Sequence, residues 1–231
     1  MDGWKNEKLI SLAKFINGFA FKPDDWGKVG LPIIRIEQLK NPRAISDYYN
    51  GKIPTENIID NGDLIFSWSA SLFLSIWNYG KAALNQHLFK VIEKENVNRI
   101  FLKYLIEYYL PVFENASHGS TMKHITRKDL NVFQVYYPTS KPEQTKIAEI
   151  LSTVDRAIEQ TEALIAKQQR IKTGLMQGLL TKGIDEHGNI RSEETHEFKD
   201  SPLGRIPVEW ECLTIDDIVI YVGSGVTPRG G

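Results

Sequence analysis

The chain has 231 residues, of which 42% are hydrophobic and 25% charged, and its net charge is −1. This composition is ordinary for a globular protein with a sizeable core, and no run approaches the 18 apolar residues of a membrane span. The first residues lack the basic and then apolar form of a signal peptide, so a cytoplasmic protein is expected. The single cysteine, Cys212, excludes an internal disulfide and a cysteine-based metal site.

The charge is distributed unevenly along the chain. Residues 1–140 carry 17 Lys and Arg against 14 Asp and Glu, whereas residues 141–231 carry 11 against 15. The first part is therefore mildly basic and the rest acidic. This difference is compatible with a nucleic-acid partner for the first part, but it is also common in proteins that have none.

The first 141 residues alternate short apolar runs with turn signals. Five runs are rich in Ile, Val, Phe, Tyr and Trp and are bounded by Gly, Asn, Asp or Pro, which is typical of strands: LPIIRIEQL, GDLIFSW, SLFLSIWNYG, HLFKVIE and NVFQVYYP. Between residues 96 and 116 apolar residues instead recur at helical spacing, up to Pro111. The pattern predicts an α+β domain with a substantial sheet.

A long amphipathic helix follows. Pro142 suits its first turn, and Glu143 complements the positive end of the helix dipole. A series of alternating steps of four and three then holds apolar residues at Ile147, Leu151, Val154, Ile158, Ile165, Leu175 and Leu179, with Thr161, Gln168 and Lys172 at its remaining positions. Such a series favours coiled-coil packing. The alternative is a core helix of its own domain, although residues 142–178 would be ~55 Å long, more than the diameter of that domain.

The chain then repeats its opening. Residues 181–208 are polar, acidic and interrupted by Gly and Pro, which indicates a linker. Trp210 then precedes an apolar stretch that ends in Gly225, much as Trp4 precedes one that ends in Gly18. We therefore expect residues 209–231 to be the opening strand of a second, incomplete domain.

Several of these segments match one protein family. The segment from Tyr136 to Gly183 resembles the conserved region of the specificity subunits of type I restriction-modification systems, with the Glu143-Gln144 pair, the Leu-x-x-x-Asp element at Leu151 and a Leu-Leu-Thr ending at Thr181. The upstream elements NGDLIFSWSAS, LNQHLFKV and GSTMKHITRKDLNVF resemble parts of that family's target recognition domain.

The resemblance implies an α+β fold, with a globular mixed α/β recognition domain at residues 1–141 and a long helix at residues 142–180 that packs as an antiparallel coiled coil. It implies no catalysis in this chain. Methyltransferase and restriction subunits would be the partners on double-stranded DNA, and S-adenosylmethionine, ATP and Mg would bind only to those partners. Family members hold two recognition domains on two such helices. With one of each here, we expect either a truncated or a cut chain, and a homodimer through Ile147, Leu151, Val154, Ile158, Ile165 and Leu175.

Phosphate contacts by Lys and Arg and base contacts by polar side chains are expected to bind DNA. The strongest candidate is the segment SHGSTMKHITRKD, and the alternative is an exposed basic loop. Lys22 follows a glycine-containing turn, and the alternative there is a hydrophobic strand end anchored by Phe19 and Phe21. Arg35 and Gln38 have the side chains that read guanine and adenine, but either also suits a plain surface position. The candidate residues are Lys22, Arg35, Gln38, Ser120, Thr121, Lys123, His124, Arg127 and Lys128.

No enzyme signature survives inspection. The chain has no Pro-Pro dipeptide for an adenine methyltransferase motif, no P-loop, and no histidine pair with zinc-ligand spacing. The rival hypothesis is therefore not an enzyme but a scaffold or adaptor whose coiled coil binds protein and whose globular part binds no DNA.

Overall fold

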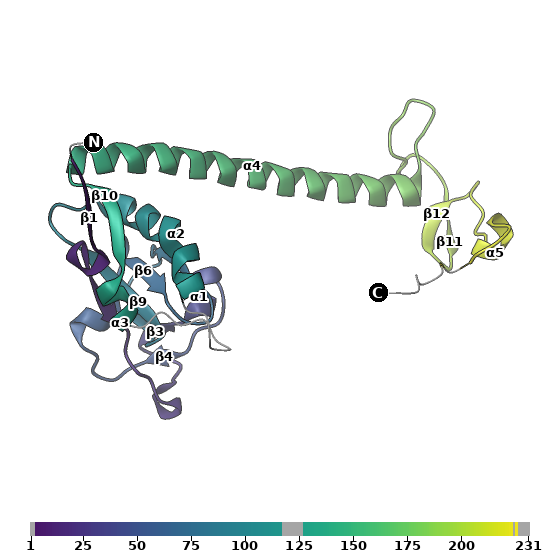
Figure 1. The fold of residues 1–231 in the computed structure, drawn as a ribbon. Helices are drawn as coiled ribbons and strands as arrows, with labels where there is room; N and C mark the ends of the chain where they lie inside the picture. The colour runs from purple at the N-terminus through teal and green to yellow at the C-terminus, as the bar shows by residue number, and fades with distance from the viewer. Residues whose placement is uncertain (1–2, 117–126, 224, 226–231) are drawn as a thin grey trace. The chain divides into compact units, whose positions relative to one another are not determined.

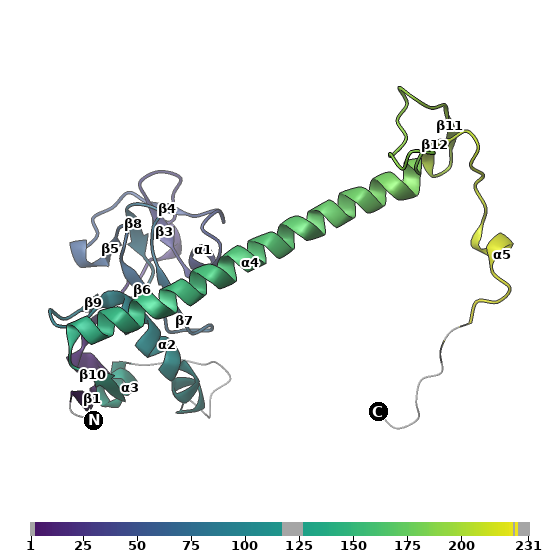
Figure 2. The ribbon, with the colours of Figure 1, turned by 90° about the horizontal axis from the view of Figure 1, so that it is seen from above.

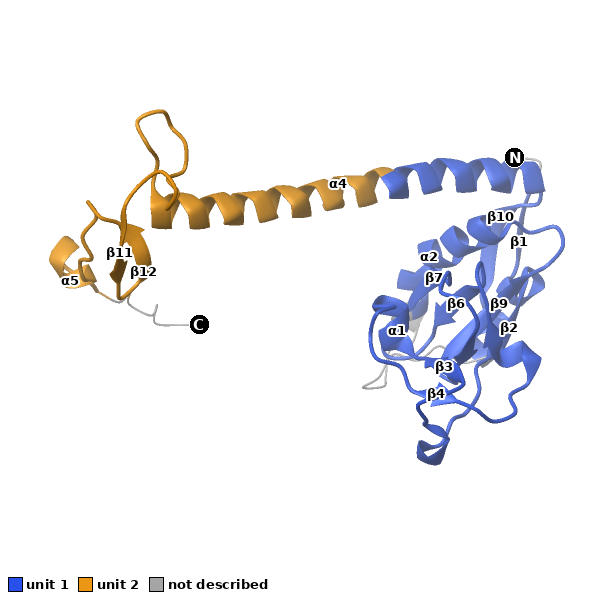
Figure 3. Ribbon diagram, turned by 180° about the vertical axis from the view of Figure 1, so that it is seen from behind, with its two compact units in different colours: residues 1–156 blue, residues 157–231 orange. Residues whose placement is uncertain are grey.

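A computed structural model describes residues 3–116, 127–223 and 225. The chain forms two compact units, residues 1–156 (unit 1) and 157–231 (unit 2), which are coloured separately in Figure 3. Helix α4 (Lys141–Lys182) belongs to both, and its 42 residues correspond to ~63 Å. The predicted α+β class, with a mixed domain followed by a long helix, is confirmed. No helix among the described residues is long and apolar enough to cross a membrane.

The main sheet of unit 1 is antiparallel, with the strand order β2-β9-β6-β7. Its strands are β2 (Ala13–Asn17), β6 (Leu64–Ser67), β7 (Phe73–Ile76) and β9 (Leu88–Glu93). All four residues of β6 are fully buried, so this strand has both faces covered. One face packs against helix α2 (Arg99–Ala116), and in this core Phe15 meets Phe66 and Phe89 edge to face.

Two smaller sheets complete unit 1. One has the order β4-β3-β8-β5, with a parallel β3–β8 pair, and the other pairs β1 with β10 in antiparallel fashion. Their strands are β1 (Trp4–Lys8), β3 (Leu31–Ile34), β4 (Tyr48–Tyr49), β5 (Ile58–Ile59), β8 (Ala82–Leu84) and β10 (Gln134–Pro138). Short helices lie between them: η1 (Leu9–Ser11), η2 (Pro23–Asp25), η3 (Thr55–Asn57), α1 (Ile36–Lys40) and α3 (Arg127–Val132). Figures 1 and 2 show β3 and β4 at one end of unit 1, and β1 and β10 at the other.

One expectation about these elements was wrong. The run LPIIRIEQL forms a strand only to Ile34, because Gln38 caps the main chain of Arg35 and starts helix α1. The helical spacing before Pro111 corresponds to helix α2, which continues through this proline to Ala116. An internal proline removes a helical hydrogen bond, and the burial of Phe113, stacked on Phe133 with ring centroids 3.7 Å apart, offsets that loss.

Unit 2 contains more structure than the predicted linker. Residues 198–207 form a hairpin of β11 (Phe198–Ser201) and β12 (Gly204–Pro207), and Ile184 bridges to Ile190. Gly204, with φ of 97°, supplies the left-handed residue of the hairpin turn. Within residues 209–223 the expected opening strand is replaced by a capped helical turn, α5 (Ile215–Ile218). A strand needs a neighbour to pair with, whereas a capped turn satisfies its own backbone.

The first turns of α4 are fixed to unit 1 by the buried side chain of Gln144. Its amide nitrogen donates to the carbonyl of Pro138 at 2.9 Å, and its Oε1 accepts from the backbone N–H of Asn98 at 2.8 Å. Gln144 thus joins the end of β10 and the residue before α2 to the start of α4. Ala148 enters the core one turn later.

We predict that Gln144→Leu lowers the free energy of unfolding by about 2–3 kcal/mol, because it leaves a buried N–H and a buried carbonyl without partners. Urea titration followed by tryptophan fluorescence measures this change. The control is Gln160→Leu, at an exposed position of the same helix, which should leave stability nearly unchanged. Equal stability of the two variants would contradict the role given to Gln144.

Candidate nucleic-acid interface

The basic segment before β10 is described only in part. Ser120, Thr121, Lys123 and His124 lie outside the described residues, as does the side chain of Arg127. Lys128 is exposed on α3, which is anchored by the buried Leu130. The N–H of Leu9 donates to the carbonyl of Phe133 at 2.8 Å and joins the end of α3 to η1.

Lys22 lies at the start of η2, with its side chain exposed. Its backbone N–H donates to Asp25 Oδ2 at 2.7 Å, which fixes the turn. The preceding residues are anchored as the structural alternative expected, since Phe19 and Phe21 pack edge to face, 5.0 Å apart, and both rings meet Tyr49. The ammonium group of Lys22 is thus available to a phosphate on a firmly held turn.

Arg35 is already engaged within unit 1. Its Nη1 lies 2.7 Å from Asp47 Oδ2, and its guanidinium stacks over the ring of Trp26 at 4.9 Å. Its Nη2 is buried and finds no hydrogen-bond partner among the described residues. Bidentate reading of a guanine needs two free donors on one edge of the guanidinium. Arg35 can serve that purpose only if its pair with Asp47 opens.

Gln38 is not available to a base edge. Its side chain is only 1% exposed, and its amide accepts from the N–H of Arg35 and donates to the carbonyl of Ile45 at 2.8 Å. Both hydrogen bonds are local, one to the start of α1 and one to the loop that follows this helix. The prediction that Gln38 reads adenine is therefore corrected, because its buried amide is used in hydrogen bonds to the main chain of Arg35 and Ile45. A single sequence does not reveal which polar residue of an amphipathic run faces inward.

The assembly face of α4 divides into a docked part and an exposed part. Ile147 packs against the core of unit 1, so its expected place in an intermolecular contact is corrected. The remaining predicted positions are exposed, from 38% at Leu151 to 62% at Ile165. We call these five residues the α4 seam: Leu151, Val154, Ile158, Ile165 and Leu175.

A polar contact that the sequence did not reveal fixes α4 near the start of this seam. The hydroxyl of Tyr104, on α2, donates to Asp155 Oδ2 at 2.7 Å and lies 3.2 Å from Ser152 Oγ. Burial, and then the Asp155 carboxylate, raise the pKa of Tyr104, so its hydroxyl keeps the proton that it donates. The contact aligns α4 with α2 over its first four turns. The spacing of Asp155 after Leu151 was visible in the sequence, but its partner on α2 was not.

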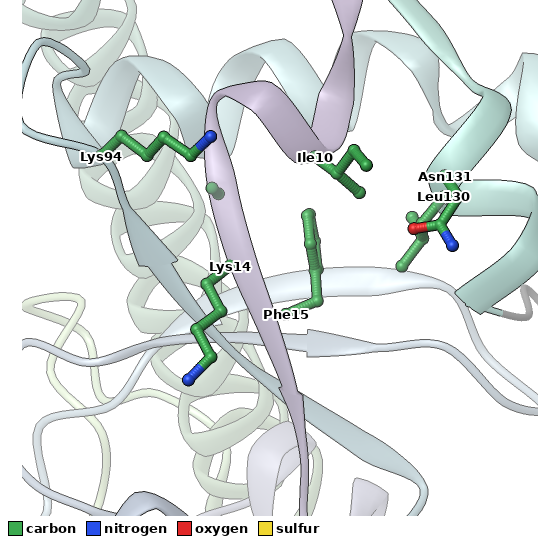
Figure 4. A pocket seen from close by; sticks show the side chains of 7 residues that line it. Ile10, Lys14, Phe15, Lys94, Leu130 and Asn131 are labelled. Carbon is green, nitrogen blue, oxygen red and sulfur yellow. The ribbon is translucent and has the colours of Figure 1, made fainter.

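A surface hollow of about 500 Å³ lies beside η1, β2 and α3 (Figure 4). Ile10, Phe15 and Leu130 contribute apolar atoms, while Lys14 and Lys94 project from its other side. The described residues that line the hollow include no Asp, Glu, His or Cys, and Lys14 Nζ lies 3.9 Å from Glu56 Oε2, which is not among the lining residues. Among the described residues no three His, Cys, Asp or Glu side chains gather in a metal-binding group.

The sequence is similar to DNA specificity domains and subunits of type I restriction systems. Residues 1–168 match the family described as the type I restriction modification DNA specificity domain. The specificity subunit of the EcoBI type I restriction enzyme of Escherichia coli is 27% identical over 226 residues, which cover 94% of this chain and 47% of that protein. The MjaVIII specificity subunit of Methanocaldococcus jannaschii is 24% identical over 221 residues, with 94% and 49% covered. The chain thus spans about half the length of these curated relatives.

Solved structures of low sequence identity share the fold. The HsdS subunit from Thermoanaerobacter tengcongensis gives a TM-score of 0.57 at 18% identity, over 78% of this chain and 44% of that chain. The type I system S subunit from M. genitalium gives 0.55 at 16%, over 80% and 47%. Because the family match covers 168 of 231 residues, including all of unit 1, the chain belongs to the type I restriction-modification DNA specificity domain family.

Proposed function

We propose that this chain is a specificity subunit that reads one half of a split DNA sequence and recruits methyltransferase and restriction subunits. The observation that supports this most is the family match over residues 1–168, which spans unit 1 and the first turns of α4. In this proposal the chain has no chemistry of its own. S-adenosylmethionine, ATP and Mg would bind to the partner subunits.

The exposed cations of unit 1 suit the DNA-binding half of this proposal. Lys22 is exposed on a turn that its own hydrogen bond to Asp25 closes, and Lys128 is exposed on α3, whose end is joined to η1 and whose Leu130 is buried. Contacts of this kind supply affinity through phosphates and make binding salt-dependent. Lys123 and Arg127 remain the leading candidates in the segment before β10, by sequence alone.

The α4 seam suits the assembly half of the proposal. We propose that two copies of the chain pair through it as antiparallel helices, since an apolar stripe at heptad spacing is a surface that a second helix covers. The 26 residues of α4 after Arg156 correspond to ~39 Å. That length is close to the ~34 Å between half-sites one DNA turn apart. The helix would then set the spacing of the two half-sites.

We predict that Lys123→Ala combined with Arg127→Ala weakens DNA binding by the complex of this chain with its methyltransferase subunits. Each lost phosphate contact reduces the slope of log K against log salt by about 1, so the double variant should lose about 2. Fluorescence anisotropy over a salt series measures this slope. Lys5→Ala with Lys8→Ala, on β1, removes the same charge and should leave the slope unchanged.

The same titration separates the two classes of function. A scaffold whose globular part binds no DNA would leave the wild-type complex at the affinity of the methyltransferase subunits alone. In that case the proposed specificity role fails. An intact wild-type slope that the double variant does not change would reject only these two residues.

We predict that Ile158→Asp combined with Ile165→Asp converts the dimer into a monomer, because it places two carboxylates on each face of the buried seam. Sedimentation velocity at micromolar concentration measures the change. Gln160→Asp with Ala163→Asp adds the same charge to the opposite side of the helix and should leave the dimer intact. A monomeric wild-type chain at this concentration would reject the homodimer.

A further inference from the structure

Two exposed turns of unit 1 are held from beneath by buried polar side chains. One is the loop of residues 41–47, between α1 and β4. The other is the turn of residues 68–72, between β6 and β7. Both belong to the same unit, and a lysine at the end of α1 joins them.

The 41–47 loop begins as a tight turn. Asn41 and Pro42 occupy the positions that these residues favour at the start of a β-turn. The N–H of Ala44 donates to the carbonyl of Asn41 at 2.8 Å, and the N–H of Arg43 donates to Asn41 Oδ1 at 3.2 Å. The side chain of Arg43 is left exposed beyond the end of α1.

The far side of this loop is fixed by Gln38 and by Asp47. The amide of Gln38 holds the carbonyl of Ile45, and the carbonyl of Asp47 accepts from the N–H of Ile33 at 2.7 Å. Ile45 itself is 94% exposed. An exposed isoleucine on a loose loop is unremarkable. Here the main chain beneath it is tied to a buried glutamine, so its side chain is presented in one place.

The 68–72 turn contains a strained residue at its tip. Ala70 has φ of 60°, the one positive value among the described non-glycine residues, and it is exposed. The conformation is unfavourable for an alanine and persists only where the surroundings enforce it. Ser67, which is fully buried, donates its hydroxyl to the carbonyl of Ser71 at 2.6 Å and closes the turn.

Lys40 connects the two turns. Its Nζ donates to Ser71 Oγ at 2.8 Å and lies 5.6 Å from the centre of the Phe73 ring. The end of α1, from which the 41–47 loop leaves, is therefore linked to the 68–72 turn. Lys40 thus brings one cationic group to the second turn, and the exposed Arg43 carries another on the first loop. The combination of rigid apolar tips with cations matches the base edges and phosphates of a DNA major groove.

We propose that these two turns form a preorganised base-reading surface, in which Ile45 contacts the 5-methyl group of a thymine and buried Gln38 positions it. This inference rests on the proposed DNA-reading function. A thymine methyl is the apolar feature of the major groove, and an aliphatic side chain is its usual partner. Arg43 and Lys40 lie where they can meet the flanking phosphates, and the Ala70 tip is small enough to approach a base closely.

The test uses the complex of the full chain with its methyltransferase subunits and the half-site that methylation mapping identifies. Each thymine of the half-site is replaced in turn by uracil, which lacks only the methyl group. For the wild-type chain we expect one position to lose affinity roughly fourfold, the effect of one buried methyl-sized group. With Ile45→Ser, uracil and thymine at that position should bind equally.

The controls separate reading from folding. Ile10→Ser, a partly exposed isoleucine in η1, should keep the full thymine preference. Gln38→Met should reduce that preference while leaving the salt slope of binding unchanged, which an unfolded unit would not do. A thymine preference that survives Ile45→Ser, or a wild-type complex indifferent to every uracil, would overturn the inference.

Two other outcomes are distinct. If Ile45→Ser leaves DNA binding intact but weakens assembly with the methyltransferase subunits, the surface binds protein and the inference is wrong. If the wild-type complex shows no preference for any sequence, the proposed function itself fails.

Discussion

The arrangement of unit 1 depends on one buried hydrogen-bonding side chain, Gln144. Three chain segments far apart in sequence meet at its amide: the end of β10, the loop before α2 and the first turn of α4. An amide that both donates and accepts can satisfy two main chains at once, which no apolar side chain can do. The Tyr104–Asp155 contact, about three turns further on, holds the part of α4 that belongs to unit 1 against α2. The apolar packing of Ile147 and Ala148 then stabilises the docked turns, but it constrains their orientation less than the hydrogen bonds do.

The same principle recurs on the surface that we assign to DNA. Gln38 and Ser67 are buried polar residues whose hydrogen bonds end on the main chain of an exposed turn. A buried polar group without a partner is costly, so each such bond holds its turn in one conformation. Recognition by direct contact needs this rigidity, because a mobile tip would lose conformational freedom on every encounter with DNA. The side chains that touch no ligand are then as important as those that do.

The elements that could be predicted from the sequence are those with a regular pattern of apolar residues. The long helix and its heptad series were visible because one face repeats at a fixed interval, and β6 was visible as an apolar run that follows the turn residues Gly62 and Asp63. The sequence did not predict the end of β3 at Ile34, the passage of α2 through Pro111 or the hairpin of unit 2, since each depends on a tertiary contact or a local cap. For the site, residue type alone made Gln38 a base reader. Its burial, which reverses that role, is set by a loop seven residues away.

The assembly face of α4 follows from the way its first turns are used. The heptad series continues from Ile147 to Leu175 with polar residues at three of its positions, Thr161, Gln168 and Lys172, and unit 1 covers only its first member. The residues after it keep the same spacing while half of each side chain remains in contact with solvent. An isolated helix of this length gains no stability from such a stripe, because helices in water are stabilised chiefly by packing of their apolar face. The partner helix that we propose would cover this stripe, while the polar contacts of Gln144 and Asp155 hold the first four turns of α4 on unit 1.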